Sequence, residues 1–283
     1  MRHFAISVIA VCAPLAVTIV VFAQGLGISP RLVVAYFKER PALILRSLLA
    51  AIVLVPLAAL AVILLLKPSP SLAIGLAILV SCPPAPLMVA TATTKGGANA
   101  VFLASLHLSL AALGFFTVPA VLFLLSRSLG FSADVHLGTL TWILLRTILV
   151  PIGLGLAARA FYPALADRVG PVLGRAGNVA IAVLLVLLAL AFFPTLVMDR
   201  WSYLVVAAVT AVALGIGHLL GPANAREKTV LAIECGSRHP ALALAIGSAN
   251  FGADRAVPIL IPCILTSAAV ALVYLAWRRR SSG

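Results

Sequence analysis

One short stretch near the C-terminal end holds most of the ionisable chemistry of an otherwise apolar region, and it reads Ile233-Glu234-Cys235-Gly236-Ser237-Arg238-His239-Pro240. It combines a carboxylate, a guanidinium and an imidazole, and it closes with a proline. Each ionisable side chain costs roughly 3 kcal/mol in a bilayer on insertion scales, and Gly and Pro free backbone groups that hydrocarbon cannot satisfy. We therefore expect protein to enclose this stretch as half of a substrate site at mid-membrane.

Glu234 and Arg238 are the first candidates for a charged centre. Glu234 is the only acidic residue inside the apolar runs of the sequence, which makes it a candidate cation ligand, proton carrier or partner of a fixed cation. Arg238 follows four residues later and would share a helix face with Glu234 if the helix were continuous. Two interpretations stay open: a structural ion pair, or an Arg238 fork free to bind a substrate carboxylate, which a guanidinium suits by shape.

Other polar side chains inside apolar runs are weaker candidates. His239 adjoins Arg238, and His107 lies in the middle of a run. A lone histidine in a helix is usually a satisfied core residue, but one that faces the cavity could titrate near neutral pH and couple transport to protons. Thr91 offers a hydroxyl after a proline cluster. Arg146 either reaches outward to the membrane surface or lines the substrate path.

The composition indicates a polytopic membrane protein. The 283 residues are 63% hydrophobic and 10% charged, whereas soluble proteins carry about 25% charged residues. The net charge of +13 does not indicate nucleic-acid binding, because the basic residues lie between apolar runs instead of forming a patch. The cysteines lack metal-ligand spacing, and enzyme motifs are missing. We therefore expect no metal site, no cofactor and no enzymatic activity.

Nine apolar runs are long enough to cross a bilayer as helices. They cover residues 4–25, 42–66, 71–94, 98–126, 138–161, 174–196, 201–221, 228–250 and 256–277. The first run could also be a secretory signal, but its length favours a retained helix. Lys and Arg are in excess on the side away from the N-terminus, so we expect the N-terminus outside and the C-terminus in the cytoplasm of a bacterial inner membrane.

Two of these spans contain helix-breaking residues. Span eight is interrupted by Gly236 and Pro240, and span three by the cluster Cys82, Pro83, Pro84 and Pro86. The two spans are five apart, so they would cross the membrane in opposite directions. Interrupted helices at corresponding positions of an inverted repeat mark the binding site of a transporter. The alternative is that the prolines only kink two helices.

Four segments, taken in order, resemble those of the bile acid:sodium symporter family, including its bacterial organic-anion members. They are the Cys-Pro run 77–83, the Lys-Gly-Gly-Ala-Asn turn 95–99, the run 146–156, which is similar to the family's Leu-Pro-x-x-x-Gly-Leu run, and the run 228–236, in which Thr229, Glu234 and Gly236 resemble the family's entry to the second crossover. The resemblance implies an inverted repeat with two crossed broken helices, of which this chain lacks the first helix. It also implies a panel of spans 4–25, 138–161 and 174–196 beside a core of the other six spans.

The chain departs from the family pattern where the family binds sodium. In the second crossover Glu234 is kept, but Arg238 and His239 replace a Gln and an Asn. The other positions that match family sodium ligands are Ala51, Met88, Val89 and His107. Hard cations need several oxygen ligands, so we expect no strict sodium dependence. We expect Arg238 to neutralise Glu234 as bound sodium would.

The sequence therefore predicts an all-helical secondary carrier that moves a small organic anion by alternating access. It would run as a uniporter, an exchanger or a proton-coupled symporter. The alternatives are an efflux permease for an oxyanion or metabolite, and a membrane sensor that keeps the fold without transport. Membrane lipid is the other expected partner, nucleic acid is not expected, and no oligomeric state is predicted.

Overall fold

The computed structural model describes residues 2–27, 29–85, 100–130, 137–191 and 198–281, and within these ranges the chain is helical without strands. The elements are α1 (Arg2–Gly27), α2 (Pro30–Glu39), α3 (Pro41–Leu49), η1 (Ala50–Leu54), α4 (Val55–Leu66), α5 (Pro70–Ser81), α7 (Ala100–Leu129), α8 (Leu137–Leu144), η2 (Leu145–Leu149), α9 (Val150–Phe161), α10 (Pro163–Ala191), α11 (Arg200–Leu220), α12 (Ala225–Gly236), α13 (Pro240–Phe251) and α14 (Ala253–Ser281).

Six helical stretches are long and apolar enough to cross a membrane. They are Pro41–Leu66, Phe102–Leu129, Thr141–Phe161, Pro163–Ala191, Arg200–Leu220 and Ala253–Arg280. Shorter apolar helices cover Pro14–Gly27 and Pro70–Ser81. The prediction of an all-helical, multi-pass membrane protein is therefore confirmed, while the nine spans and the inverted repeat stay predictions.

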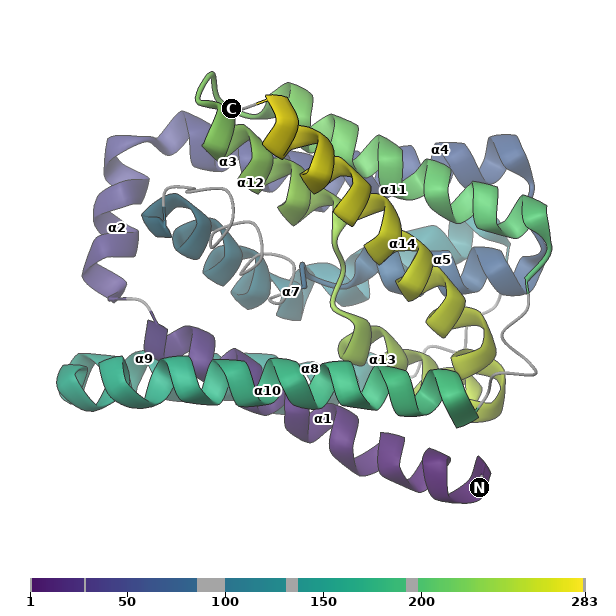
Figure 1. Ribbon diagram of the computed structural model, residues 1–283, viewed down its shortest axis with the longest axis horizontal. Helices are drawn as coiled ribbons and strands as arrows, with labels where there is room; N and C mark the ends of the chain where they lie inside the picture. Colours follow the sequence, from purple (N-terminus) through teal and green to yellow (C-terminus); the bar gives the residue numbers. More distant parts are fainter. Residues whose placement is uncertain (1, 28, 86–99, 131–136, 192–197, 282–283) are drawn as a thin grey trace.

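The helices form two layers. In Figure 1, α1, α8, α9 and α10 lie in the lower layer, and α3, α4, α5, α7, α11, α12 and most of α14 lie above them. Glycines bring α1 and α9 together: a Cβ on Gly155 would lie 2.4 Å from the carbonyl oxygen of Phe22, and one on Gly25 would lie 2.6 Å from that of Ile152. The lower layer holds the three spans that the sequence assigns to a panel, although that division into domains stays a prediction.

Two helix boundaries differ from the sequence-based expectation. The span predicted to begin at 174 begins at Pro163, because α10 continues as a helix through a charged turn that periodicity alone assigns to a loop. The short helix α2 lies between two predicted spans, outside both. Pro30 at its first turn favours a helix start, and it ends before Pro41. This amphipathic helix connects the two layers, as Figure 1 shows.

Two long helices contain one π-helical segment each, directly before a Val-Pro pair. The segment η1 precedes Pro56, and η2 precedes Pro151. Proline has no N–H and its ring crowds the preceding turn, and a π-bulge is one way in which a helix accommodates it. The helices therefore continue through their prolines.

The two predicted breaks behave differently, because there the helices end. The helix α5 ends at Ser81 and α12 ends at Gly236, and α13 begins at Pro240. The residues before each proline are extended, as Pro requires of its neighbour: Cys82 has ψ 148° and His239 has ψ 105°. Pro86, Met88, Val89 and Thr91 fall within 86–99, outside the described residues.

Candidate functional site

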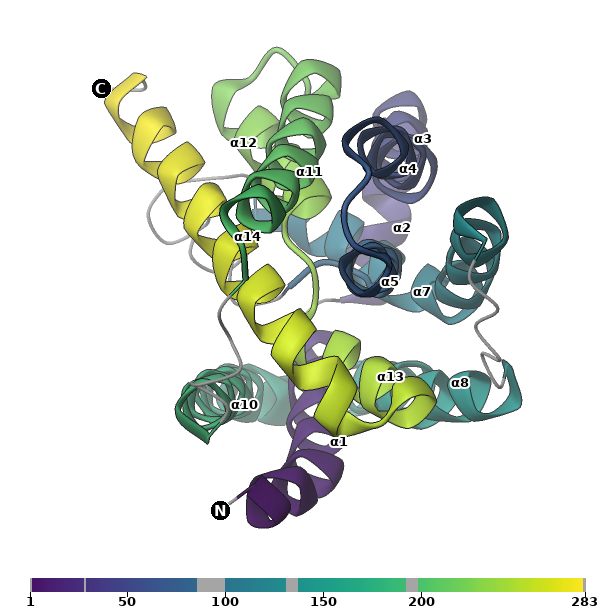
Figure 2. The same ribbon diagram turned by 90° about the vertical axis from the view of Figure 1, so that its right-hand side faces the viewer.

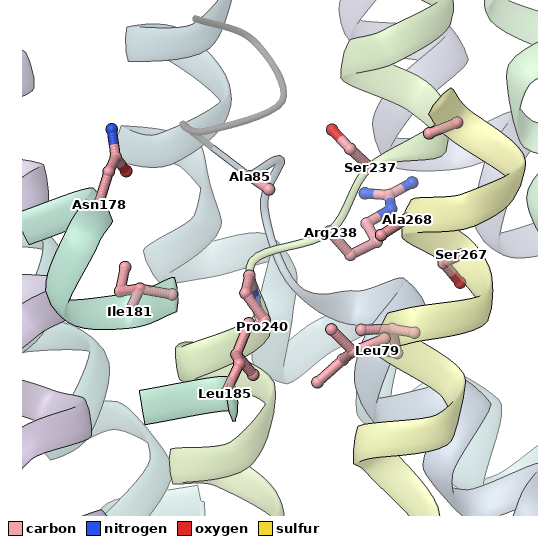
Figure 3. A pocket seen from close by; sticks show the side chains of 12 residues that line it. Leu79, Ala85, Asn178, Ile181, Leu185, Ser237, Arg238, Pro240, Ser267 and Ala268 are labelled. Atoms are coloured by element: carbon pink, nitrogen blue, oxygen red, sulfur yellow. The ribbon is translucent and has the colours of Figure 1, made fainter. Parts of the chain in front are cut away.

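The two extended breaks cross each other in the interior, as the close view in Figure 3 shows. The backbone N–H of His239 donates to the carbonyl oxygen of Pro83 at 2.8 Å. The Nη1 group of Arg238 donates to the carbonyl oxygen of Cys82 at 3.1 Å. Each break thus satisfies polar backbone groups of the other, which an apolar surrounding requires. The segments that follow α5 and α12 therefore contact each other, while the crossing of two complete broken helices stays a prediction.

Glu234 is completely buried, and its partner is His107 on α7. The imidazole Nδ1 lies 3.0 Å from Oε1 and 3.2 Å from Oε2 of the carboxylate. The other ring nitrogen, Nε2, lies 2.9 Å from the side-chain nitrogen of Gln24 on α1. A chain of three polar side chains therefore runs from α1 in one layer to α12 in the other.

The expected contact between Glu234 and Arg238 does not form, so the interpretation as a structural ion pair is wrong. Because α12 ends at Gly236, Arg238 no longer lies one helical turn above Glu234. Its guanidinium turns to the other break, and it interacts with Glu234 only at longer range. The group in contact with the carboxylate is the imidazole of His107, not the guanidinium.

Arg238 instead reaches a cavity of about 630 Å³ between α10, α14 and the two breaks. Its Nη2 group is buried, and no hydrogen-bond partner occurs among the described residues. On the opposite wall, Oδ1 of Asn178 on α10 is also buried without a partner there. The remaining walls are mainly apolar: Leu79, Ala85, Ile181, Leu185, Pro240, Ile264, Ala268 and Ala271, with the hydroxyls of Ser237 and Ser267.

A smaller cavity of about 290 Å³ reaches the other side of Arg238. Its walls include Ala51, Pro56, Cys82, Pro83 and Pro84. Ala51 is one of the positions that the resemblance assigned to a sodium ligand, and its methyl group offers no oxygen to this cavity. The hydroxyl of Ser81, also in this wall, already donates to the carbonyl oxygen of Ala77 at 2.7 Å.

The remaining predicted residues differ in their positions. His239 is buried and caps α13, since its Nδ1 accepts a hydrogen bond from the N–H of Leu242 at 3.4 Å. Its Nε2 has no hydrogen-bond partner within the described part of the chain. The thiol of Cys82 donates to the carbonyl oxygen of Ile78. Arg146 lies on the exposed side of η2, so the structure does not bring it to the crossing.

Sequence reasoning missed Gln24 and Asn178. Gln24 is the only glutamine of the chain and lies in an apolar run, which is a signal of the same kind as that of Glu234. Asn178 follows Gly177, where a Cβ would lie 2.5 Å from a side-chain carbon of Val20. The close approach of α10 to α1 at this glycine could not be read from the sequence.

Interrupted helices that meet beside a cavity, within a polytopic membrane protein, are a pointer to the binding site of a membrane transporter. A family model described as Sodium Bile acid symporter family matches residues 14–200. This is more than half of the chain, so the protein belongs to the sodium bile acid symporter family, whose members are membrane transporters. A search of curated proteins finds no match. The matched range ends before the second break, where Glu234, Arg238 and His239 lie.

Proposed function

We propose that the protein is a secondary carrier that moves a small organic anion by alternating access, without a strict requirement for sodium. The observation that carries this proposal is that Arg238 lines the cavity, while its buried Nη2 group has no hydrogen-bond partner among the described residues. A buried donor left unsatisfied is costly. A carboxylate in the cavity would satisfy both its charge and its hydrogen-bonding geometry.

The walls of the cavity support a substrate with an apolar body. Polar groups are few, with Arg238 on one wall and Asn178 on the other. We therefore favour a small carboxylate with a hydrocarbon body over an inorganic oxyanion, which would leave most of the apolar wall without contacts.

The surroundings of Glu234 support independence from sodium. Both carboxylate oxygens lie within hydrogen-bond distance of His107, so an imidazole occupies the side where a cation would approach. Sodium needs several oxygen ligands, and Ala51 in the neighbouring wall supplies none from its side chain. His107 thus takes the role that the sequence suggested for Arg238, and Arg238 is left to bind substrate.

The layered architecture supports alternating access. The 630 Å³ cavity lies between α10 of one layer and the crossing of the other, so movement of one layer against the other would change its access. The contact between Gln24 and His107 crosses the same boundary between the layers. We place the carrier in a bacterial inner membrane with the N-terminus outside, as the distribution of basic residues suggests.

A ligand screen tests the role of Arg238. Purified protein is heated with a panel of carboxylates, and the same panel is applied to Arg238→Gln and to the control Arg146→Gln, which removes a cation from the exposed side of η2. We expect stabilising carboxylates to bind about 10- to 150-fold more weakly to Arg238→Gln, which corresponds to a charged hydrogen bond of roughly 1.5–3 kcal/mol. Equal binding to wild type and Arg238→Gln would refute the site.

Flux measurements test the transport cycle. Proteoliposomes are loaded with the best carboxylate from the screen, and counterflow is measured with sodium replaced by potassium at fixed membrane potential. We expect flux to persist without sodium, and a dependence on an imposed pH gradient would identify the proton as the coupling ion. A strict sodium requirement would refute this part of the proposal. Binding without counterflow would instead identify a sensor.

A further inference from the structure

A second cavity lies on the other side of α5 from the crossing. Ile78 lines this cavity, whereas the next residue, Leu79, lines the cavity that holds Arg238. The second cavity is therefore separate from the proposed substrate site, and its occupant is inferred independently of the proposed function.

Two helix faces and one aromatic side chain form the walls. The α5 residues Ser71, Ile74, Gly75 and Ile78 follow the spacing of a single helix face, and α14 contributes Arg255, Ala256, Ile259 and Leu260, while Phe251 ends α13. Figure 2 shows α5, α13 and the beginning of α14 as neighbours. Close contacts border the cavity: a Cβ on Gly75 would lie 2.5 Å from Ile259, and one on Gly247 would lie 2.6 Å from Leu260.

The cavity is polar at one end and apolar along its length. Ser71 and Arg255 lie in the first turns of α5 and α14, where both helices begin. Ile78 lies seven residues further along α5, about 10 Å away at 1.5 Å per residue. Arg255 is exposed, and no carboxylate forms an ion pair with it in the described ranges. A cation at the mouth of an apolar cavity complements an anion that carries a hydrocarbon chain.

We propose that this cavity binds a long-chain carboxylate. Arg255 and Ser71 hold the carboxylate head, and the isoleucines of α5 and α14 together with Phe251 contact the chain. The ends of membrane-spanning helices lie near the boundary between bilayer and water, where an amphiphile keeps its charged head while its chain stays in the apolar region. A long-chain carboxylate in the bilayer would therefore reach the cavity in the orientation that the walls require.

Equilibrium binding of a fluorescent long-chain carboxylate, cis-parinaric acid, tests the proposal on the purified full chain in detergent. We expect saturable binding that palmitate displaces and that hexadecanol displaces much more weakly. Arg255→Gln should weaken binding about tenfold or more, since a hydrogen bond to a charged group is lost. The matched control is Arg200→Gln, which removes an exposed cation at the start of α11 and should leave binding unchanged.

A second variant tests the chain-binding part. Ile74→Trp fills the cavity from the face of α5 and should abolish most parinarate binding, with an unfolding midpoint close to that of wild type as evidence of folding. Three outcomes would overturn the proposal. They are equal binding to wild type and Arg255→Gln, equal displacement by hexadecanol and palmitate, and a loss of binding in Arg238→Gln but not in Arg255→Gln, which would place the probe at the crossing.

Discussion

Removal of the imidazole next to Glu234 should destabilise the protein strongly. Glu234 is completely buried, and within the described chain its close partner is His107, with 3.0 and 3.2 Å from Nδ1 to the two carboxylate oxygens. His107→Leu places an apolar side chain at this position of the helix and leaves the Glu234 carboxylate without the imidazole. Breaking a buried pair by removing one partner costs about 3–5 kcal/mol.

A cost of about 3–5 kcal/mol should lower the unfolding midpoint of His107→Leu by roughly 6–20 °C, at about 2–4 °C per kcal/mol. A double variant then separates the loss of the interaction from the loss of each residue. His107→Leu combined with Glu234→Leu removes both polar partners. Replacing a whole buried pair by apolar residues is often neutral, so we expect the double variant to recover most of the midpoint.

A thiol-reactive dye provides the assay, because Cys82, Cys235 and Cys263 are buried and become reactive on unfolding. The matched control is His218→Leu, which removes a histidine that bonds the Tyr274 hydroxyl at 2.8 Å and should cost about 1 kcal/mol. Two results would refute this prediction. One is a His107→Leu midpoint no lower than that of His218→Leu. The other is a double variant whose loss of midpoint equals the sum of the losses in His107→Leu and Glu234→Leu, because the carboxylate would then not depend on the imidazole.

Two further predictions concern helix ends and helix contacts. The pKa of Asp199 lies below its usual range because the backbone N–H and the hydroxyl of Ser202 donate to its carboxylate. The ionised carboxylate therefore stabilises the folded protein above the unfolded pKa near 4, and this stabilisation is lost as the pH falls through the lower folded pKa. The unfolding midpoint of Asp199→Asn should consequently change less than that of wild type between about pH 5 and pH 2; parallel curves would contradict this. Gly217→Ala should cost about 1–3 kcal/mol, since its Cβ would lie 2.5 Å from the carbonyl oxygen of Leu231, whereas Gly215→Ala meets nothing within 4 Å and should be neutral or stabilising by thermal unfolding; equal midpoints for the two variants would contradict the packing.

The sequence predicted the helical class correctly, and α5 and α12 end where it placed helix-breaking residues, for local reasons. Long apolar runs determine spanning helices. A lone proline such as Pro56 or Pro151 does not end its helix here, whereas the helices do end before the Pro83-Pro84 pair and within the segment 236–240. The ends of α5 at Ser81 and of α12 at Gly236 therefore follow from the chain on either side of them. The short helix α2 was missed because its 10 residues fall well below the roughly 20 that a membrane-spanning helix needs.

The partners within the site could not be predicted in the same way, because they depend on which helices meet. Spacing along the chain suggested Arg238 for Glu234, but the end of α12 redirects the guanidinium to the other break. The actual partner, His107, is 127 residues away in the chain. Arg146 matched a family segment, yet its exposure depends on which face of η2 meets the neighbouring helices.

The hydrogen bond from the N–H of His239 to the carbonyl oxygen of Pro83 joins the two breaks through main-chain atoms alone. Such a bond does not depend on side-chain identity, provided that residue 239 is not a proline. The side chains that surround the crossing can therefore be exchanged in evolution without separating the two breaks.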